Sequence, residues 1–157
     1  MQKITPFLWF DNKAEEAVNF YVSIFKNSSI GTVTRYSEAA AAASGQSAGS
    51  VMTMAFKLNG QDFVALNGGP HFKFSEAVSF IVNCDSQKEI NHFWDKLSAG
   101  GPVEAQQCGW LKDRYGLSWQ VVPTVLPELL SKSPHGVMQA VLQMKKIDIA
   151  SLQKAAA

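Results

Sequence analysis

Two related heptapeptides set the architecture of this chain: Thr5-Pro-Phe-Leu-Trp-Phe-Asp11 and, 74 residues further along (79 minus 5), Ser79-Phe-Ile-Val-Asn-Cys-Asp85. Each is a short apolar run that ends in Asp, which is typical of a strand followed by a turn. Repetition at a fixed offset indicates that one structural unit occurs twice. We therefore take these two runs as the first strands of two equivalent units.

An amphipathic helix is predicted after each heptapeptide. Its apolar residues are three and four apart, which places them on one helix face. They are Ala14, Ala17, Val18, Tyr21, Ile24 and Phe25 in the first unit, and Ile90, Phe93, Trp94 and Leu97 in the second. With a one-residue adjustment the helices align, so that Tyr21 matches Trp94 and Ile24 matches Leu97.

Three further strands are expected in each unit. They cover Ile30–Tyr36, Val51–Leu58 and Asp62–Leu66 in the first, and Val103–Gln107, Trp110–Asp113 and Leu117–Val122 in the second. Asn59-Gly60 supplies the positive φ angles of a tight hairpin, and Tyr115-Gly116 stands at the corresponding place. The sequence thus predicts two βαβββ units.

Residues 38–50, rich in Ala, Ser and Gly, have no apolar periodicity. We expect them to form a mobile loop between the second and third strands of the first unit. The linker between the units is predicted at Asn67-Gly68-Gly69-Pro70-His71, a turn-rich stretch.

The length and composition of the chain suit one domain. It has 157 residues, of which 46% are hydrophobic and 17% charged. We expect a single domain over residues 1–157, with a first module at 1–67, a second at 75–123 and a helical tail at 124–157.

The tail is predicted to contain helices around Leu126–Ser131 and after Ser133-Pro134. In the second helix one apolar face collects Val137, Met138, Val141 and Leu142. Either the same subunit or a second copy must cover this face, and we expect a homodimer.

Charge and cysteine content narrow the classes of partner. Lys and Arg total 14 against 13 Asp and Glu, so the net charge of +1 favours neither nucleic acid nor an anionic membrane, and a small neutral molecule is the expected partner. The sequence shows neither a signal peptide nor a membrane-spanning run, which predicts a cytoplasmic protein. Cys84 and Cys108 are expected to be reduced thiols.

Several motifs together resemble the PhnB-like family, which carries the label 3-demethylubiquinone-9 3-methyltransferase. That family is a branch of the vicinal oxygen chelate superfamily, which includes glyoxalases and bleomycin-resistance proteins. The resemblance implies an α+β fold in which two βαβββ modules form a cupped mixed sheet, with helices outside, a ligand cavity inside and usually a homodimer. The motifs are Thr5–Asp11, Ala14-Glu-Glu-Ala17, Phe20-Tyr21, Ile24-Phe25, Cys108-Gly-Trp-Leu-Lys-Asp113, Tyr115-Gly116, Trp119-Gln-Val-Val-Pro123 and Met144-Lys-Lys-Ile-Asp148.

Metal enzymes of the superfamily hold a divalent ion on four His or Glu side chains, one from the first and one from the last strand of each module. Mapped through the repeat, these positions are Thr5, Ser79, a site near Val64, and Gln120. Hydroxyls, an apolar side chain and a neutral amide are poor ligands for transition metals, so we expect no metal. The histidines, His71, His92 and His135, are expected at the surface.

Strand alternation predicts the wall of a ligand pocket. Its candidate residues are Thr5, Phe7, Trp9, Ser79, Ile81, Asn83, Cys108, Trp110 and Gln120, with Ser118 and Val122 on the same face as Gln120. Apolar and aromatic side chains with a few neutral polar groups are typical of small-molecule sites. The alternative is that they simply fill the core of the cup.

Cofactor binding is not expected. The only glycine-rich candidates, Gly68-Gly69-Pro70 and Gly100-Gly101-Pro102, contain a proline that removes a backbone donor, and neither opens a βαβ unit. This pattern argues against methyl transfer despite the family label.

Whether the protein is an enzyme stays open at this stage. The first hypothesis is a protein that binds a small molecule without chemistry, and the second is a metal-independent enzyme that uses Cys108 or a polar pocket residue. A third is a dimeric interaction module with a filled cup. A thiol needs an activating neighbour, and neither Lys112 nor Asp113 can be shown from sequence to face Cys108.

Overall fold

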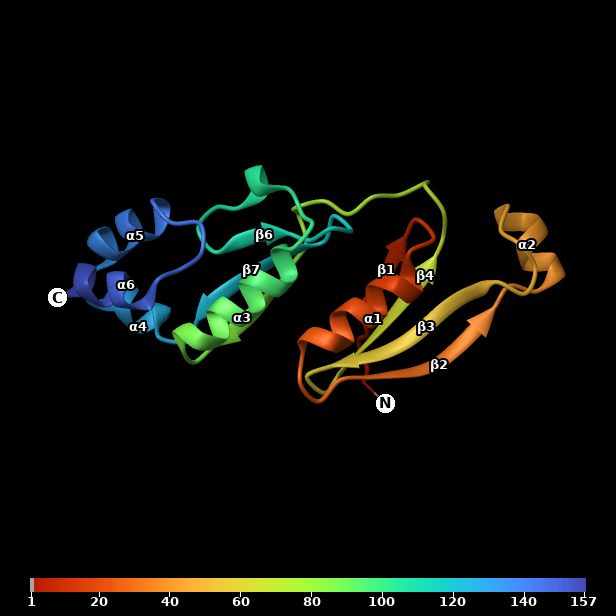
Figure 1. Cartoon of the computed structure of the whole chain (residues 1–157), viewed down its shortest axis with the longest axis horizontal. Coiled ribbons are helices and arrows are strands. Elements are labelled where there is room, and N and C mark those ends of the chain that lie inside the picture. The colour runs from red at the N-terminus through yellow and green to blue at the C-terminus, as the bar shows by residue number, and fades with distance from the viewer. Residues whose placement is uncertain (1) are drawn as a thin grey trace. The chain divides into compact units, whose positions relative to one another are not determined.

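The computed structural model describes residues 2–157 and divides the chain into two compact units, residues 1–73 and 74–157 (Figure 1). The expected first module falls within the first unit, whereas the expected second module and the helical tail fall within the second. No helix among residues 2–157 is long and apolar enough to cross a membrane.

The first unit is a four-stranded sheet with one long helix. Its elements are β1 (Phe7–Phe10), α1 (Ala14–Ile24), β2 (Ser29–Arg35), α2 (Glu38–Ser44), β3 (Val51–Leu58) and β4 (Gln61–Asn67). The strand order is β1-β4-β3-β2, with β1 parallel to β4 and the other pairs antiparallel. Asn59 and Gly60 have φ angles of 50° and 80°, so the predicted hairpin turn between β3 and β4 is confirmed.

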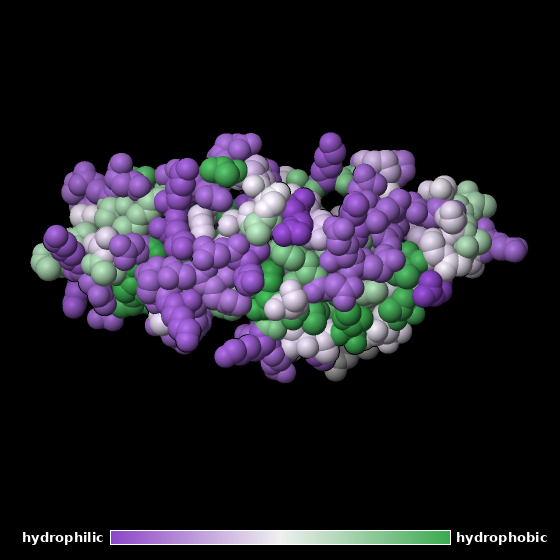
Figure 2. Space-filling model, in the orientation of Figure 1, coloured by the Kyte–Doolittle hydropathy of each residue, from purple (hydrophilic) through white to green (hydrophobic). Residues whose placement is uncertain are grey.

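The helix α1 covers one side of this sheet and forms the core with it. Leu8 and Phe10 of β1 point to this side and are buried, as is Tyr21 of α1, whose ring stacks on Phe56 with centroids 6.5 Å apart. Asn67, at the end of β4, accepts a hydrogen bond of 2.8 Å from the backbone N–H of Ala14 and so caps the helix. Towards β2 the apolar cover is incomplete, and Figure 2 shows apolar side chains reaching the surface over the region of α1, β2 and β3.

The loop predicted for residues 38–50 is wrong, because its first half is the helix α2. Five consecutive alanines have the highest intrinsic helix propensity, although they give no polar–apolar contrast. Ser37 accepts a bond from the N–H of Ala40 at the N-terminus, and Gly45 ends the helix in the left-handed conformation with φ of 78°. Propensity and capping therefore specify a helix where periodicity is silent.

The second unit repeats the strand and helix pattern and adds the tail. Its elements are β5 (Ser79–Cys84), α3 (Gln87–Ser98), a 3-10 turn η1 (Val103–Ala105), β6 (Trp110–Lys112), β7 (Ser118–Pro123), α4 (Leu126–Lys132), α5 (Pro134–Leu142) and α6 (Ile149–Ala156). The strand order is β5-β7-β6, with β5 parallel to β7 and β6 antiparallel to it.

The strand predicted at Val103–Gln107 is wrong. This segment begins with η1, and Gln107 makes only an isolated bridge to Trp110. Cys108 and Gly109 have φ angles of 54° and 84°, so the chain reverses too sharply for a paired strand to form. The second unit consequently has three strands where the first has four.

The parallel strand pairs confirm the sequence repeat in register. Phe7 of β1 pairs with Val64 of β4, and Ile81 of β5 pairs with Gln120 of β7. Ile81 is 74 residues after Phe7, the offset of the two heptapeptides. Val64 and Gln120 are therefore equivalent positions.

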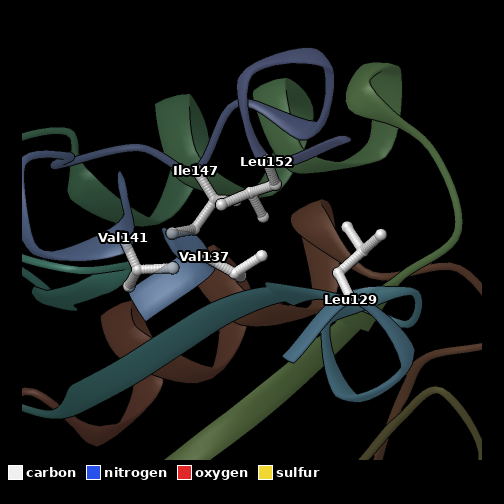
Figure 3. Close-up of a cluster of buried hydrophobic side chains, with 5 residues drawn as sticks. All are labelled: Leu129, Val137, Val141, Ile147 and Leu152. Atoms are coloured by element: carbon white, nitrogen blue, oxygen red, sulfur yellow. The ribbon is translucent and has the colours of Figure 1, made fainter. Parts of the chain in front are cut away.

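The tail helices α4, α5 and α6 pack around a small core of their own, defined here as the C-terminal cluster: Leu129, Val137, Val141, Ile147 and Leu152 (Figure 3). Of the predicted apolar face of α5, Val137 and Val141 are buried, whereas Met138 and Leu142 are exposed. The helix α6 was not predicted. Asp148 caps it by accepting a bond from the N–H of Ala150.

Candidate functional site: the open sheet faces

Each sheet has one side that carries no helix of its own unit. We call the side of the first sheet that points away from α1 the first open face, and the side of the second sheet that points away from α3 the second open face. The pocket residues predicted from strand alternation fall on these two faces, with Thr5 and Cys108 as the exceptions described below.

The first open face is mainly apolar and aromatic. Its cross-strand rows follow from the strand register and comprise Phe7, Val64 and Ala55 in one row and Trp9, Leu66, Thr53 and Thr34 in the next. Thr34 and Thr53 share a hydrogen bond of 2.5 Å between their hydroxyls. Phe7 is 57% exposed on β1, an edge strand of this sheet. Thr5 lies two residues before β1 and is exposed, so the expected first strand is shorter than predicted.

Trp9 is held rigidly on the first open face by the linker that follows β4. Its indole N–H donates to the carbonyl of Gly69 at 2.9 Å, and its ring meets Phe72 edge-on with centroids 4.9 Å apart. A Cβ added to Gly68 would lie 2.2 Å from the indole ring. The glycine at position 68 is therefore required by packing against Trp9.

The second open face combines apolar and polar side chains. The register places Ile81, Gln120 and Trp110 in one row and Ser79, Ser118 and Lys112 in the next, with Asn83 and Val122 beyond the first row. The Gln120 amide donates to the Ser79 hydroxyl at 3.0 Å. Ile81 is 55% exposed, at the position equivalent to Phe7.

One edge of the second open face is charged. The Lys112 ammonium forms an ion pair and a hydrogen bond with the carboxylate of Glu76, which lies in the segment before β5. The hydrogen bond from Lys112 lowers the pKa of Glu76 below its ordinary value. Next to Lys112 in the same row, Ser118 is only 2% exposed.

The structure places Cys108 against the C-terminal cluster. Its backbone N–H donates to Met144 at 2.8 Å, and its sulfur accepts a bond of 3.3 Å from the Gln107 amide. The tail residues fold over this part of the chain, so Cys108 is half-buried.

Asp113 has a structural role, as expected for a carboxylate in a turn. It is 1% exposed and accepts hydrogen bonds from the backbone N–H groups of Tyr115 and Leu117 and from the indole of Trp119, at 2.8, 3.1 and 2.9 Å. The carboxylate thereby ties the turn between β6 and β7 to the core beneath α3.

The residues at the superfamily's metal positions do not fit a divalent ion. Val64 on the first open face offers no donor, and Ser79 and Gln120 on the second are hydrogen-bonded to each other. Within residues 2–157 no group of three or more His, Cys, Asp or Glu side chains could hold a metal. The prediction that His71, His92 and His135 are surface residues is confirmed, since all three are exposed.

Sequence reasoning missed Lys112 and Glu76 as members of the site. Lys112 is two residues after Trp110, and strand alternation could have placed it on the same face. Glu76 lies outside any strand or helix, so no pattern in the sequence signals its contact with Lys112.

The fold is similar to that of the glyoxalase and bleomycin-resistance proteins. The family model described as 3-demethylubiquinone-9 3-methyltransferase matches residues 2–122. The chain belongs to this family, also called PhnB-like. No curated protein matches it.

Solved structures agree with this assignment. A Bacillus cereus structure described as a PhnB protein is 38% identical, and the match covers 78% of this chain and 100% of that one with a TM-score of 0.67. Protein PA1353 from Pseudomonas aeruginosa is 20% identical, with 78% and 98% of the chains covered and a TM-score of 0.58. The fosfomycin-resistance protein FosX from Listeria monocytogenes is 12% identical, with 82% and 97% covered and a TM-score of 0.52. The last two show similarity of fold alone.

Proposed function

We propose that this protein binds a small molecule on an open sheet face, without a divalent metal. The observation that carries the proposal is the exposure of two large apolar side chains at equivalent places, Phe7 at 57% and Ile81 at 55%. Both lie within strands on an uncovered sheet face. Contiguous apolar surface of this kind is typical of a face that contacts a ligand or a partner. Half-buried aromatic neighbours, Trp9 and Trp110, and neutral polar groups such as Gln120 complete the composition of a small-molecule site.

The absence of a metal role is part of the same proposal. It rests on the donor chemistry at the equivalent positions Val64 and Gln120 and at Ser79, which offer no imidazole and no carboxylate. A binding protein needs a few oriented hydrogen bonds, which the Gln120 amide and the Ser79 hydroxyl can supply.

Methyl transfer, the reaction in the family label, has little support from the glycine pairs. The N–H of Gly68 donates to Phe10 and the N–H of Gly101 donates to Ser98, so neither is available to a cofactor. A Cβ on Gly101 would lie 2.2 Å from the carbonyl oxygen of Lys112. These glycines serve close packing.

A metal-independent enzyme that uses Cys108 is the alternative function. The position of Cys108 against the C-terminal cluster favours a structural role, because its sulfur contacts an amide and apolar side chains. Replacement of Cys108 by Ser should leave ligand affinity unchanged. Loss of turnover or of a covalent adduct in this variant would instead support the enzyme.

The test of binding is native mass spectrometry of the protein as purified from its expressing cells, with and without Ile81→Glu. We expect a small molecule that leaves on denaturation and that Ile81→Glu no longer retains, because the variant places a charge on the second open face. Val103→Glu is the matched control, since Val103 is also an exposed apolar residue of the second unit, at 58%, but lies in η1. Retention of the ligand by Ile81→Glu would contradict the proposal. So would an unaltered protein that carries no ligand and binds none of the added probes.

We also propose that the protein is a homodimer. The exposed apolar residues Met138 and Leu142, on one side of α5, support this proposal. Sedimentation equilibrium should give twice the chain mass for the unaltered protein, and a Met138→Glu/Leu142→Glu variant should be shifted towards the monomer.

A further inference from the structure

We propose that the second open face contains a subsite for a carboxylate group of the ligand, formed by Lys112, Ser118 and Ser79. This inference rests on the proposed function and specifies its ligand as an apolar molecule that carries an anionic oxygen group. The overall charge of +1 gives no hint of such a ligand, because the preference arises from one local cluster of donors.

The strand register brings the three side chains together. Ser118 pairs with Ser79 on one neighbouring strand and with Lys112 on the other, so all three point to the same side of the sheet. Side chains of directly paired residues are about 5 Å apart, close enough to contact one small group. The row therefore offers two hydroxyls and one ammonium to a single ligand group.

The hydroxyls are arranged to donate. Ser79 accepts the bond from the Gln120 amide, which leaves its own proton for an acceptor above the sheet. Ser118 is 2% exposed, so its hydroxyl has little access to water. A hydroxyl with so little access to water is well placed to donate to an oxygen of a ligand instead.

Glu76 shows that a carboxylate fits at this place. Its carboxylate already contacts the Lys112 ammonium, and its side chain is 65% exposed in a segment outside any strand or helix. Surface ion pairs contribute little free energy, so a ligand carboxylate that also reached the two hydroxyls would displace Glu76 readily. Glu76 thus acts as an internal competitor for the subsite.

The test compares 2-naphthoate with 2-naphthamide, which share an aromatic body and differ in the charge of the polar group. By isothermal titration the unaltered protein should bind naphthoate about tenfold more tightly than naphthamide. Glu76→Gln should strengthen naphthoate binding about threefold or more, because the competitor is removed, and should leave naphthamide unaffected. Lys112→Met should abolish the preference for naphthoate.

Asp95→Asn is the matched control. Asp95 forms a 3.1 Å ion pair with Lys146 in the same unit, and its side chain is also 65% exposed, but it lies on α3. Both affinities should be unchanged in this variant. Equal binding of the two probes, or no response of naphthoate to Glu76→Gln and Lys112→Met, would overturn the subsite while naphthamide binding still supported the proposed function. Failure of both probes to bind would contradict the subsite and count against the proposed function as well.

Discussion

Gln120 donates a 3.0 Å hydrogen bond to Ser79, across 41 positions of sequence. The parallel pairing of β5 and β7 brings these residues together, and the bond satisfies one donor and one acceptor without a metal. A neutral amide–hydroxyl pair leaves the second open face suited to recognition by hydrogen bonds and apolar contact.

Removal of the Asp113 carboxylate should destabilise the second unit strongly. Asp113→Ala leaves two backbone N–H groups and the Trp119 indole without their acceptor, and each loss costs about 1–3 kcal/mol. We expect a decrease of about 3 kcal/mol or more in the free energy of unfolding by urea. Asp113→Asn keeps one acceptor oxygen and should lose less. A change below about 0.5 kcal/mol in the alanine variant would show that these bonds contribute nothing.

Gly68→Ala should disturb Trp9. The new methyl group would overlap the indole ring, so the ring must move and the free energy of unfolding should fall by about 1–3 kcal/mol. Gly31→Ala is the control, because its Cβ would lie at an ordinary 3.4 Å from the nearest atom and no positive φ is involved. Urea unfolding with tryptophan fluorescence measures both effects. Equal behaviour of the two variants would contradict the packing account of Gly68.

The two thiols should differ in reactivity. Cys84 is fully buried, and burial raises its pKa to about 12, whereas Cys108 is half-buried. Iodoacetamide at pH 8 should therefore label Cys108 first and Cys84 only after unfolding, as read by peptide mass spectrometry. Labelling of Cys84 in the folded protein at the rate of Cys108 would show that this core opens.

The raised pKa of Cys84 also predicts a dependence of stability on pH. The folded state holds the thiol proton more tightly than the unfolded state, whose pKa is near the ordinary 9.0. The contribution of this proton is therefore complete below pH 9 and is lost as the pH rises from 9 towards 12. Urea unfolding at pH 8 and pH 10.5 should show a decrease that Cys84→Ala reduces. An unchanged decrease in the variant would assign the effect to other groups.

The C-terminal cluster should hold the tail against Cys108. Leu152 is fully buried, so Leu152→Ala should cost about 2–5 kcal/mol and speed the labelling of Cys108. Leu142→Ala, at a 53% exposed position of α5, should change neither quantity by much. If Cys108 labelling stayed unchanged in a destabilised Leu152→Ala protein, the tail would not be what covers this thiol.

The sequence predicted the repeat, both amphipathic helices and the faces of the open strands, because these depend on local alternation and on one offset. The register of Phe7 with Val64 and of Ile81 with Gln120 was not predicted and comes from the structure. The helix α2 was missed because a run of alanines carries propensity without periodicity.

Contacts between segments that are distant in sequence were beyond local reasoning. The hydrogen bond from the Cys108 N–H to the Met144 carbonyl holds the candidate nucleophile against the tail. The contact between Lys112 and Glu76 joins a strand to an irregular segment. Neither contact has a spacing or a composition that a single sequence would reveal. Both depend on how the tail and the segment before β5 fold back onto the second unit.

The four tryptophans allow the binding proposal to be tested in one measurement, the ¹H–¹⁵N spectrum of the indole groups during titration with 2-naphthoate. Trp9 and Trp110 lie on the open faces, whereas Trp94 and Trp119 are buried on the helix sides at 5% and 3% exposure. We predict that the indole resonance of Trp110 shifts, because the proposed subsite lies on its face, and that those of Trp94 and Trp119 do not. Shifts confined to Trp94 and Trp119, or no shift at any of the four, would contradict binding at the open faces.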